Sequence, residues 1–177
     1  MNIQSVIAGF GGQGILFAGK LLVYTGLLKD KQVSWLPSYG PEMRGGTANC
    51  SVVISDTPVG SPIVVSPNLL VAMNLPSLDK FEDAVLPGGS IFIDSSLISR
   101  KSTRSDCKVF YIPATNMAIE NSLPGLANMI IMGKMFKELG EFTLDDVKAA
   151  LEKTVPASKT ALIEKNLNAI SLGYNYI

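Results

Sequence analysis

The fold is constrained most by a glycine turn that lies between an apolar strand-like segment and an apolar helix-like segment. Residues Ile3–Ala8 have the character of a short buried strand, and Gly9–Gly14 (GFGGQG) follows directly. Residues Ile15–Leu28 are apolar on nearly all sides, as in a mostly buried helix. Strand, glycine turn and buried helix in this order open a doubly wound α/β domain.

The turn matches the pattern G-x-G-x-x-G and favours an anion, because the free N–H groups of a helix N-terminus attract negative charge. A dinucleotide site also needs an acidic residue about 20 residues further on, at the end of the second strand. That strand runs into Leu36–Ser38, and Asp30 lies before it, so the sequence argues against NAD or FAD. A turn that only packs helix on strand, with nothing bound, explains the pattern equally well. The candidate cofactor-binding residues are Gly9, Gly11, Gly12, Gln13 and Gly14.

The rest of the chain continues an α/β pattern. The other expected strands are Lys31–Leu36 (ended by Pro37), Thr47–Ser55, Ile63–Val65, Asn68–Met73, Ser90–Asp94 and Lys108–Ile112. The expected helices are Ser77–Val85, Pro124–Leu139 stopped by Gly140, Thr143–Lys153 with a Thr143/Asp146 capping box, and Ser158–Ile170, with a loop or short helix over Pro113–Ser122. We expect a single domain over residues 1–177, a Rossmann-like three-layer α/β sandwich. Its sheet is mostly parallel with an antiparallel hairpin at the edge, for which Ile63–Val65 is the expected returning strand.

The composition excludes several kinds of active site. The 177 residues include no histidine and only two cysteines, Cys50 and Cys107. Catalytic Ser-His-Asp or Cys-His arrangements and His-ligated metals are therefore excluded. Two cysteines are too few for an iron–sulfur cluster, so we expect no metal site and interpret both cysteines as small buried apolar side chains. Redox chemistry would require cofactors or partner chains.

Charge and hydropathy indicate the surroundings in which the chain works. The 15 basic and 15 acidic residues balance, which argues against a nucleic-acid partner. Only 17% of residues are charged and 47% are hydrophobic, which favours a buried subunit interface over an apolar core alone. No apolar stretch approaches the roughly 20 residues that span a membrane, and Met1–Phe10 lacks the basic region of a secretory signal. We expect a cytoplasmic protein with reduced thiols and no membrane partner.

A second glycine-rich loop follows the second expected strand. It should lie outside the carboxyl end of that strand, where α/β sheets bind ligands. Arg44 can contact a carboxylate or phosphate through two hydrogen bonds, and Glu42 can pair with it or with a neighbouring chain. A solvated loop with an internal Glu42–Arg44 pair leaves Tyr39 and Met43 unexplained, so a binding or interface loop is favoured. The candidate residues are Tyr39, Gly40, Pro41, Glu42, Met43, Arg44, Gly45, Gly46 and Thr47.

A weaker set of polar residues follows the last expected strand. Asn116, Asn121 and Asn128 could complete the same pocket from the carboxyl end of the sheet. Ordinary helix and turn chemistry is the alternative explanation.

Together these motifs resemble a known family. The segments GFGGQGIL, AGKLL, SYGPEMRGGTANCSVVIS and LPGLANMIIMGKM are similar to the gamma subunit of 2-oxoacid:ferredoxin oxidoreductases. The resemblance runs from Met1 to about Tyr174. The GGQG turn alone is a weak signal, whereas the turn and the YGPEMRGG loop at this spacing form a specific pair. The resemblance implies a Rossmann-like fold, and we expect the stand-alone form of the subunit.

The resemblance also implies an activity for the complete enzyme. That enzyme oxidatively decarboxylates a 2-oxoacid, forms acyl-CoA and reduces ferredoxin; 2-oxoglutarate or 2-oxoisovalerate is favoured, with pyruvate as a further candidate. The implied partners are alpha, beta and ferredoxin-like delta subunits, with thiamine diphosphate and Mg²⁺ between alpha and beta and iron–sulfur clusters largely in delta. This chain alone is expected to bind no cofactor and to be inactive. Within the complex, Gly9–Gly14 and Tyr39–Gly46 are expected to shape the thiamine and coenzyme A site.

Two other functions remain open at this point. The glycine turn could belong to an independent nucleotide-binding enzyme, which would bind NAD(P), FAD or ATP without partners. The low charge could instead belong to a purely structural scaffold subunit, in which substitutions in the turn would act only through subunit affinity.

Overall fold

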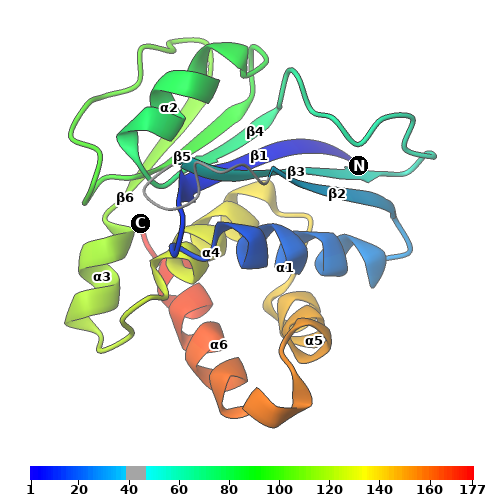
Figure 1. Ribbon diagram of the computed structural model, residues 1–177, viewed down its shortest axis with the longest axis vertical. Helices are drawn as coiled ribbons and strands as arrows, with labels where there is room; N and C mark the ends of the chain where they lie inside the picture. Colours follow the sequence, from blue (N-terminus) through cyan, green and yellow to red (C-terminus); the bar gives the residue numbers. More distant parts are fainter. Residues whose placement is uncertain (39–46) are drawn as a thin grey trace.

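The computed structural model describes residues 1–38 and 47–177, and the expected loop Tyr39–Gly46 lies outside the described residues. Six strands form one sheet in the order β2-β3-β1-β4-β5-β6 (Figure 1). The strands are β1 (Asn2–Phe10), β2 (Gln32–Ser38), β3 (Thr47–Ser55), β4 (Leu69–Ala72), β5 (Ser90–Asp94) and β6 (Lys108–Ile112). The expected mostly parallel sheet is confirmed, since β1, β4, β5 and β6 pair in parallel.

The antiparallel part of the sheet is formed by other segments than expected. Strand β3 lies between β1 and β2 and is antiparallel to both, so the edge hairpin joins β2 to β3. The prediction of a returning strand at Ile63–Val65 is wrong, because these residues adopt no strand. Val64 is 9% exposed and packs on the sheet, whereas Ile63 and Val65 are 62% and 77% exposed. The connection therefore contributes one apolar side chain to a face of the sheet and makes no backbone ladder.

Helices cover both faces of the sheet, which confirms the three-layer sandwich. They are α1 (Ile15–Leu27), α2 (Leu75–Phe81), α3 (Ala114–Glu120), α4 (Ala127–Leu139), α5 (Leu144–Thr154) and α6 (Ala161–Tyr174), with 3₁₀ turns at Glu82–Ala84 and Ala157–Lys159. Helices α1, α4, α5 and α6 lie below the sheet in Figure 1, and α2 lies above it. Each face of the sheet has its own apolar core. Ile7 of β1 belongs to the core on the side of α1 and α4, and Val6 belongs to the core on the side of α2.

Two predicted helix boundaries are confirmed, and the predicted starts of two helices are corrected. Gly140 ends α4 with φ 66°, and Thr143 with Asp146 forms a reciprocal capping box on α5. Ser77 does not cap α2: the cap is Asn74, whose side chain accepts the Ser77 N–H at 2.8 Å. Helix α4 begins at Ala127 rather than at Pro124, since a separate turn around Gly125 (φ 80°) precedes it.

The last helix and the second strand also differ in their bounds. Helix α6 runs from Ala161 to Tyr174, because the segment around Ser158 forms a 3₁₀ turn rather than an N-cap. Pro37 lies inside β2, opposite Cys50, instead of ending the strand. An edge strand makes ladder hydrogen bonds on one side only and therefore tolerates a proline.

The two cysteines lie in different environments. Cys50 is fully buried beneath α1, and burial raises the pKa of its thiol to about 12, so it remains protonated. Cys107 is only half-buried, which corrects the expectation that both are core residues.

Candidate functional site

The glycine turn lies at the carboxyl edge of the sheet, at its topological switch point. From the neighbouring strands β1 and β4 the chain departs in opposite directions, through α1 toward β2 and through α2 toward β5. Ligands of open α/β sheets bind in the crevice that this reversal creates. Gly12 and Gly14 have φ of 93° and 73°, values that glycine adopts without strain. Gly14 is the N-cap of α1 and provides no side-chain cap, so the first-turn N–H groups of α1 remain available to a ligand.

Gln13 ties the turn to the strand next to it. Its Oε1 accepts the Phe10 N–H at 2.6 Å, and its Nε2 donates to the Met73 carbonyl at 3.1 Å. The side chain folds back over Gly9, where a Cβ would lie 2.6 Å from Oε1 and 3.1 Å from Met73 Cβ. A side chain larger than hydrogen therefore has no room at Gly9.

Asn128 ties the turn to α4 from the other side. Its Nδ2 donates to the Gly14 carbonyl at 3.1 Å, and the same carbonyl accepts the Ala18 N–H at 3.0 Å. A Cβ on Gly14 would overlap the Asn128 amide, so Gly14 is required for contact as well as for its φ. Asn128 is 3% exposed, and its Oδ1 has no hydrogen-bond partner among the described residues.

Two cavities flank the turn. One of about 260 Å³ is lined mainly by apolar groups that follow β4, β5 and β6, and it also contacts Gly12 and Gln13. The other, of about 340 Å³, lies between Gly14 and the start of α6. Its lining residues are Gly14, Phe17, Gly125, Leu126, Asn128, Val155, Pro156, Lys159, Leu162 and Asn166. Gly125 contacts both cavities, so the segment before α4 separates them.

The electrostatics of the turn favour a negatively charged ligand. Neither cavity is lined by an aspartate or glutamate in the described part of the chain, and the first turn of α1 carries none. Lys159 is exposed and provides a positive charge in the same cavity as Gly14. A helix N-terminus adds a partial positive charge to this cation. Over residues 1–38 and 47–177, no group of three or more metal-ligating side chains is close enough to hold an ion.

The remaining predicted residues are only partly brought to the turn. Thr47 opens β3 opposite Phe10, and Ser38 ends β2 opposite Asn49, so both flanks of residues 39–46 lie at the carboxyl edge. Asn116 is exposed on α3, and Asn121 donates back to Met117 of the same helix at 2.8 Å. Neither lines a cavity beside the turn. Of the three asparagines, only Asn128 belongs to the site.

Met73 and Lys159 are site residues that the sequence interpretation missed. Met73 enters because β4, which is remote in sequence, lies beside β1 in the sheet. Lys159 enters because α6 begins near the turn. The expected strand Asn68–Met73 could have suggested Met73, whereas no local sequence signal points to Lys159.

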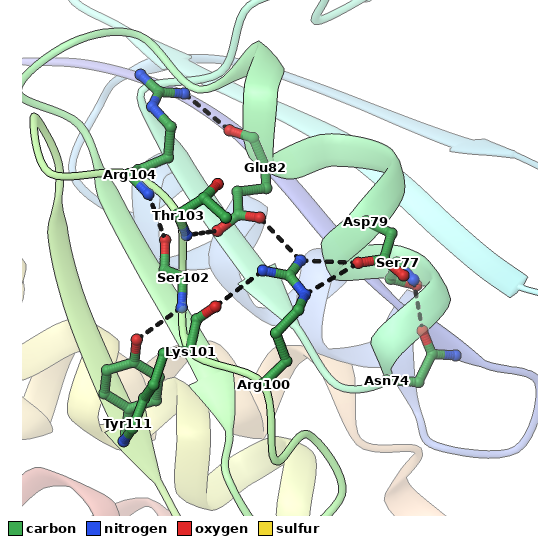
Figure 2. A network of polar contacts seen from close by, with 10 residues as sticks. All are labelled: Asn74, Ser77, Asp79, Glu82, Arg100, Lys101, Ser102, Thr103, Arg104 and Tyr111. Atoms are coloured by element: carbon green, nitrogen blue, oxygen red, sulfur yellow. Dashed lines mark hydrogen bonds and ion pairs between the residues drawn. The ribbon is translucent and has the colours of Figure 1, made fainter.

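A second polar cluster lies on the other side of the sheet (Figure 2). Glu82 accepts from Arg100 Nη2 at 2.8 Å and from the Thr103 N–H at 2.9 Å, and Arg100 also contacts Asp79 at 2.7 Å. Burial alone would raise the pKa of Glu82, but the hydrogen bonds from Arg100, Ser102 and Thr103 outweigh it and hold the pKa below its ordinary value. These contacts attach the β5–β6 connection to α2. None of these residues lines either cavity, so we interpret the cluster as structural.

Comparison with known proteins decides the family. The model of the pyruvate ferredoxin/flavodoxin oxidoreductase family matches residues 4–176. The chain belongs to this family. Among residues 1–38 and 47–177, no helix is both long enough and apolar enough to cross a membrane.

Relatives in this oxidoreductase family differ in length. The chain is 41% identical to ketoisovalerate oxidoreductase subunit VorA of Methanothermobacter thermautotrophicus over 97% of its own length, but it spans only 36% of that relative. It is 37% identical to 2-oxoglutarate synthase subunit KorC of Methanocaldococcus jannaschii, and the match covers 98% of this chain and 93% of the relative. The crystal structure of a keto/oxoacid ferredoxin oxidoreductase gamma subunit from Geobacter sulfurreducens superimposes with a TM-score of 0.82, at 26% identity, over 97% of this chain and 96% of the other.

Proposed function

We propose that the chain is the gamma subunit of a cytoplasmic 2-oxoacid:ferredoxin oxidoreductase that converts a 2-oxoacid and coenzyme A into acyl-CoA. The partners are alpha, beta and ferredoxin-like delta subunits, and ferredoxin accepts the electrons. Similarity along nearly the whole length to KorC, and to a gamma subunit of known structure, supports this assignment. A 2-oxoglutarate or 2-oxoisovalerate substrate agrees with the names of the relatives KorC and VorA.

The observation that carries the proposal is the uncapped N-terminus of α1, which shares a cavity with Lys159 and with no acidic side chain among the described residues. This arrangement suits the phosphate groups of coenzyme A, because backbone N–H groups and an ammonium both attract phosphate oxygens. The buried Oδ1 of Asn128 has no hydrogen-bond partner among the described residues, and it fits the same ligand because the ribose and adenine of coenzyme A also carry donors. When bound, coenzyme A would supply the thiol that takes up the acyl group.

An iron–sulfur cluster has no ligand set among the described residues of this chain. A thiamine diphosphate site needs ligands for its Mg²⁺, and a cluster site needs several thiolates. Cys50 is buried and protonated, and the described residues bring no three metal-ligating side chains together. We therefore propose that the iron–sulfur clusters lie in the partner subunits, and the family resemblance places thiamine diphosphate and Mg²⁺ there as well.

The apolar cavity next to the turn has a different role in this proposal. Leu97 and Ile119 line it and are 47% and 67% exposed, and none of its lining residues in the described part of the chain is charged. An exposed apolar rim around a cavity is typical of an interface with another protein. The loop Tyr39–Gly46, whose flanks leave the same edge, is proposed to face the catalytic subunits.

The test uses the complex assembled with its alpha, beta and delta partners. Charge reversal by Lys159→Glu should raise KM for coenzyme A about tenfold or more and leave KM for the 2-oxoacid unchanged. The matched control is Lys165→Glu, which makes the same charge change on an exposed residue of α6 that lines neither cavity. Equal KM values for coenzyme A in the two variants would refute the site. Oxidoreductase activity of the isolated chain, or tight binding of NAD(P) or FAD to it, would favour an independent nucleotide-binding enzyme instead.

A further inference from the structure

Two side-chain amides hold the glycine turn from opposite sides, and neither is needed to close the turn itself. The turn already has its own backbone hydrogen bond, from the Gln13 N–H to the Phe10 carbonyl at 3.2 Å. Its torsion angles are set by glycines. The side chains of Gln13 and Asn128 instead connect the turn to β4 and α4, the two elements that border its cavities.

Both polar atoms of the Gln13 amide are used within the protein. Oε1 accepts from Phe10 and Nε2 donates to Met73, so the amide bridges the carboxyl ends of β1 and β4 across the switch-point crevice. These two hydrogen bonds fix the position of the amide relative to both strands. Gln13 is predicted from the sequence to bind the cofactor, and its contacts point to a further task, the orientation of the turn.

The orientation of the Asn128 amide is fixed by the group that it contacts. The Gly14 carbonyl is an acceptor, so the nitrogen of the amide must face it. That carbonyl also accepts the first intrahelical hydrogen bond of α1, from Ala18. Asn128 therefore holds the peptide at the point where α1 begins and where its free N–H groups point outward.

We propose that Gln13 and Asn128 are positioning residues, which aim the N–H groups of the turn and of the first turn of α1 at the phosphate groups of the ligand. The inference rests on the proposed function and deepens it by assigning to Gln13 and Asn128 the orientation of the backbone groups that bind. Binding by backbone N–H groups is sensitive to small displacements, because a hydrogen bond weakens steeply as its angle and length depart from the optimum.

The experiment compares coenzyme A with pantetheine, which has the same thiol end but no phosphate groups. In the assembled complex, Gln13→Met and Asn128→Leu remove the amides while keeping side chains of similar size. Each should raise KM for coenzyme A about tenfold, with kcat retained at saturation and KM for pantetheine unchanged. The controls Gln32→Met and Asn168→Leu make the same changes at exposed positions and should leave both KM values unchanged.

A second measurement uses the full chain without partners. Gln13→Met should accelerate hydrogen exchange of the Phe10 N–H, which loses its acceptor, whereas Gln13→Glu keeps an acceptor and should restore its protection. Equal losses with coenzyme A and pantetheine, or a fall in thermal stability with both KM values unchanged, would mean that the amides are only structural and would overturn the inference. If Lys159→Glu raises KM for coenzyme A and the amide variants do not, the site stands and the positioning role is wrong. If none of the three variants raises it, the proposed site itself is wrong.

Discussion

The contact between α4 and α6 should tolerate no side chain at Gly133. A Cβ at this position would overlap the Ile170 carbonyl and lie 2.9 Å from the Tyr174 nitrogen. Gly133→Ala gains about 1 kcal/mol of helix propensity but causes overpacking that costs about 3 kcal/mol, since the atoms it meets are backbone and cannot rotate away. We expect a net loss of about 2 kcal/mol, which corresponds to a fall in Tm of about 4–8 °C for a chain of this size.

Urea unfolding of the full chain, followed by circular dichroism, measures this loss as a lower midpoint with an unchanged m value. The matched control is Gly140→Ala at the end of the same helix. There φ is 66° and no atom of residues 1–38 or 47–177 outside the immediate backbone lies within 4 Å of the added Cβ, so only the backbone cost of about 1 kcal/mol applies. A Gly133→Ala variant as stable as the wild-type protein would refute the reasoning, because helix propensity would then outweigh the contact. Since α4 also carries Asn128, the same variant should weaken coenzyme A binding in the complex.

Three further predictions concern other parts of the molecule. Asn74→Ala should lower the free energy of unfolding by about 1 kcal/mol through loss of the α2 cap, whereas Ser77→Ala should be nearly neutral, and urea midpoints compare the two. Glu82→Gln should cost about 1–3 kcal/mol at pH 7 by breaking the contact with Arg100. The folded-state pKa of Glu82 is lowered, so its contribution to stability is present above its ordinary pKa and is lost as the pH falls through the folded-state pKa. The urea midpoint of the variant should therefore fall less steeply with decreasing pH than the midpoint of the wild-type protein. Arg44→Ala should change assembly, or KM for the 2-oxoacid or coenzyme A, in the reconstituted complex; no change in any of them would exclude a role for the loop.

The parts of the fold that the sequence predicts well are those set by local chemistry. The glycine turn, the capping box of Thr143 and the stop at Gly140 depend on residues within a few positions, and all three are confirmed. The bounds predicted for the strands Ser90–Asp94 and Lys108–Ile112 are also confirmed, because short runs of β-branched and aromatic residues give a clear local signal.

The errors come from contacts between distant residues. The predicted hairpin partner of β3 is wrong because a short apolar run such as Ile63–Val65 after a turn favours a strand but does not reveal whether a backbone ladder exists. Pro37 was placed outside its strand because the edge position of β2 depends on the sheet order. The site was predicted in part for the same reason: the turn is local, whereas Asn128 reaches it from 114 positions away along the chain.

The insertion of β3 between β1 and β2 has a consequence for synthesis on the ribosome. The first two strands emerge together with α1, yet they do not pair with each other and share no ladder until Thr47–Ser55 has followed. The other side of β1 stays open for longer, until Leu69–Ala72 arrives. A nascent chain of this protein therefore carries a central strand with two bare edges during early elongation, and unpaired edges of this kind attract other chains. Chaperone binding to ribosome-bound chains should accordingly be strongest before β4 is released, and it should decline once both neighbours of β1 are in place.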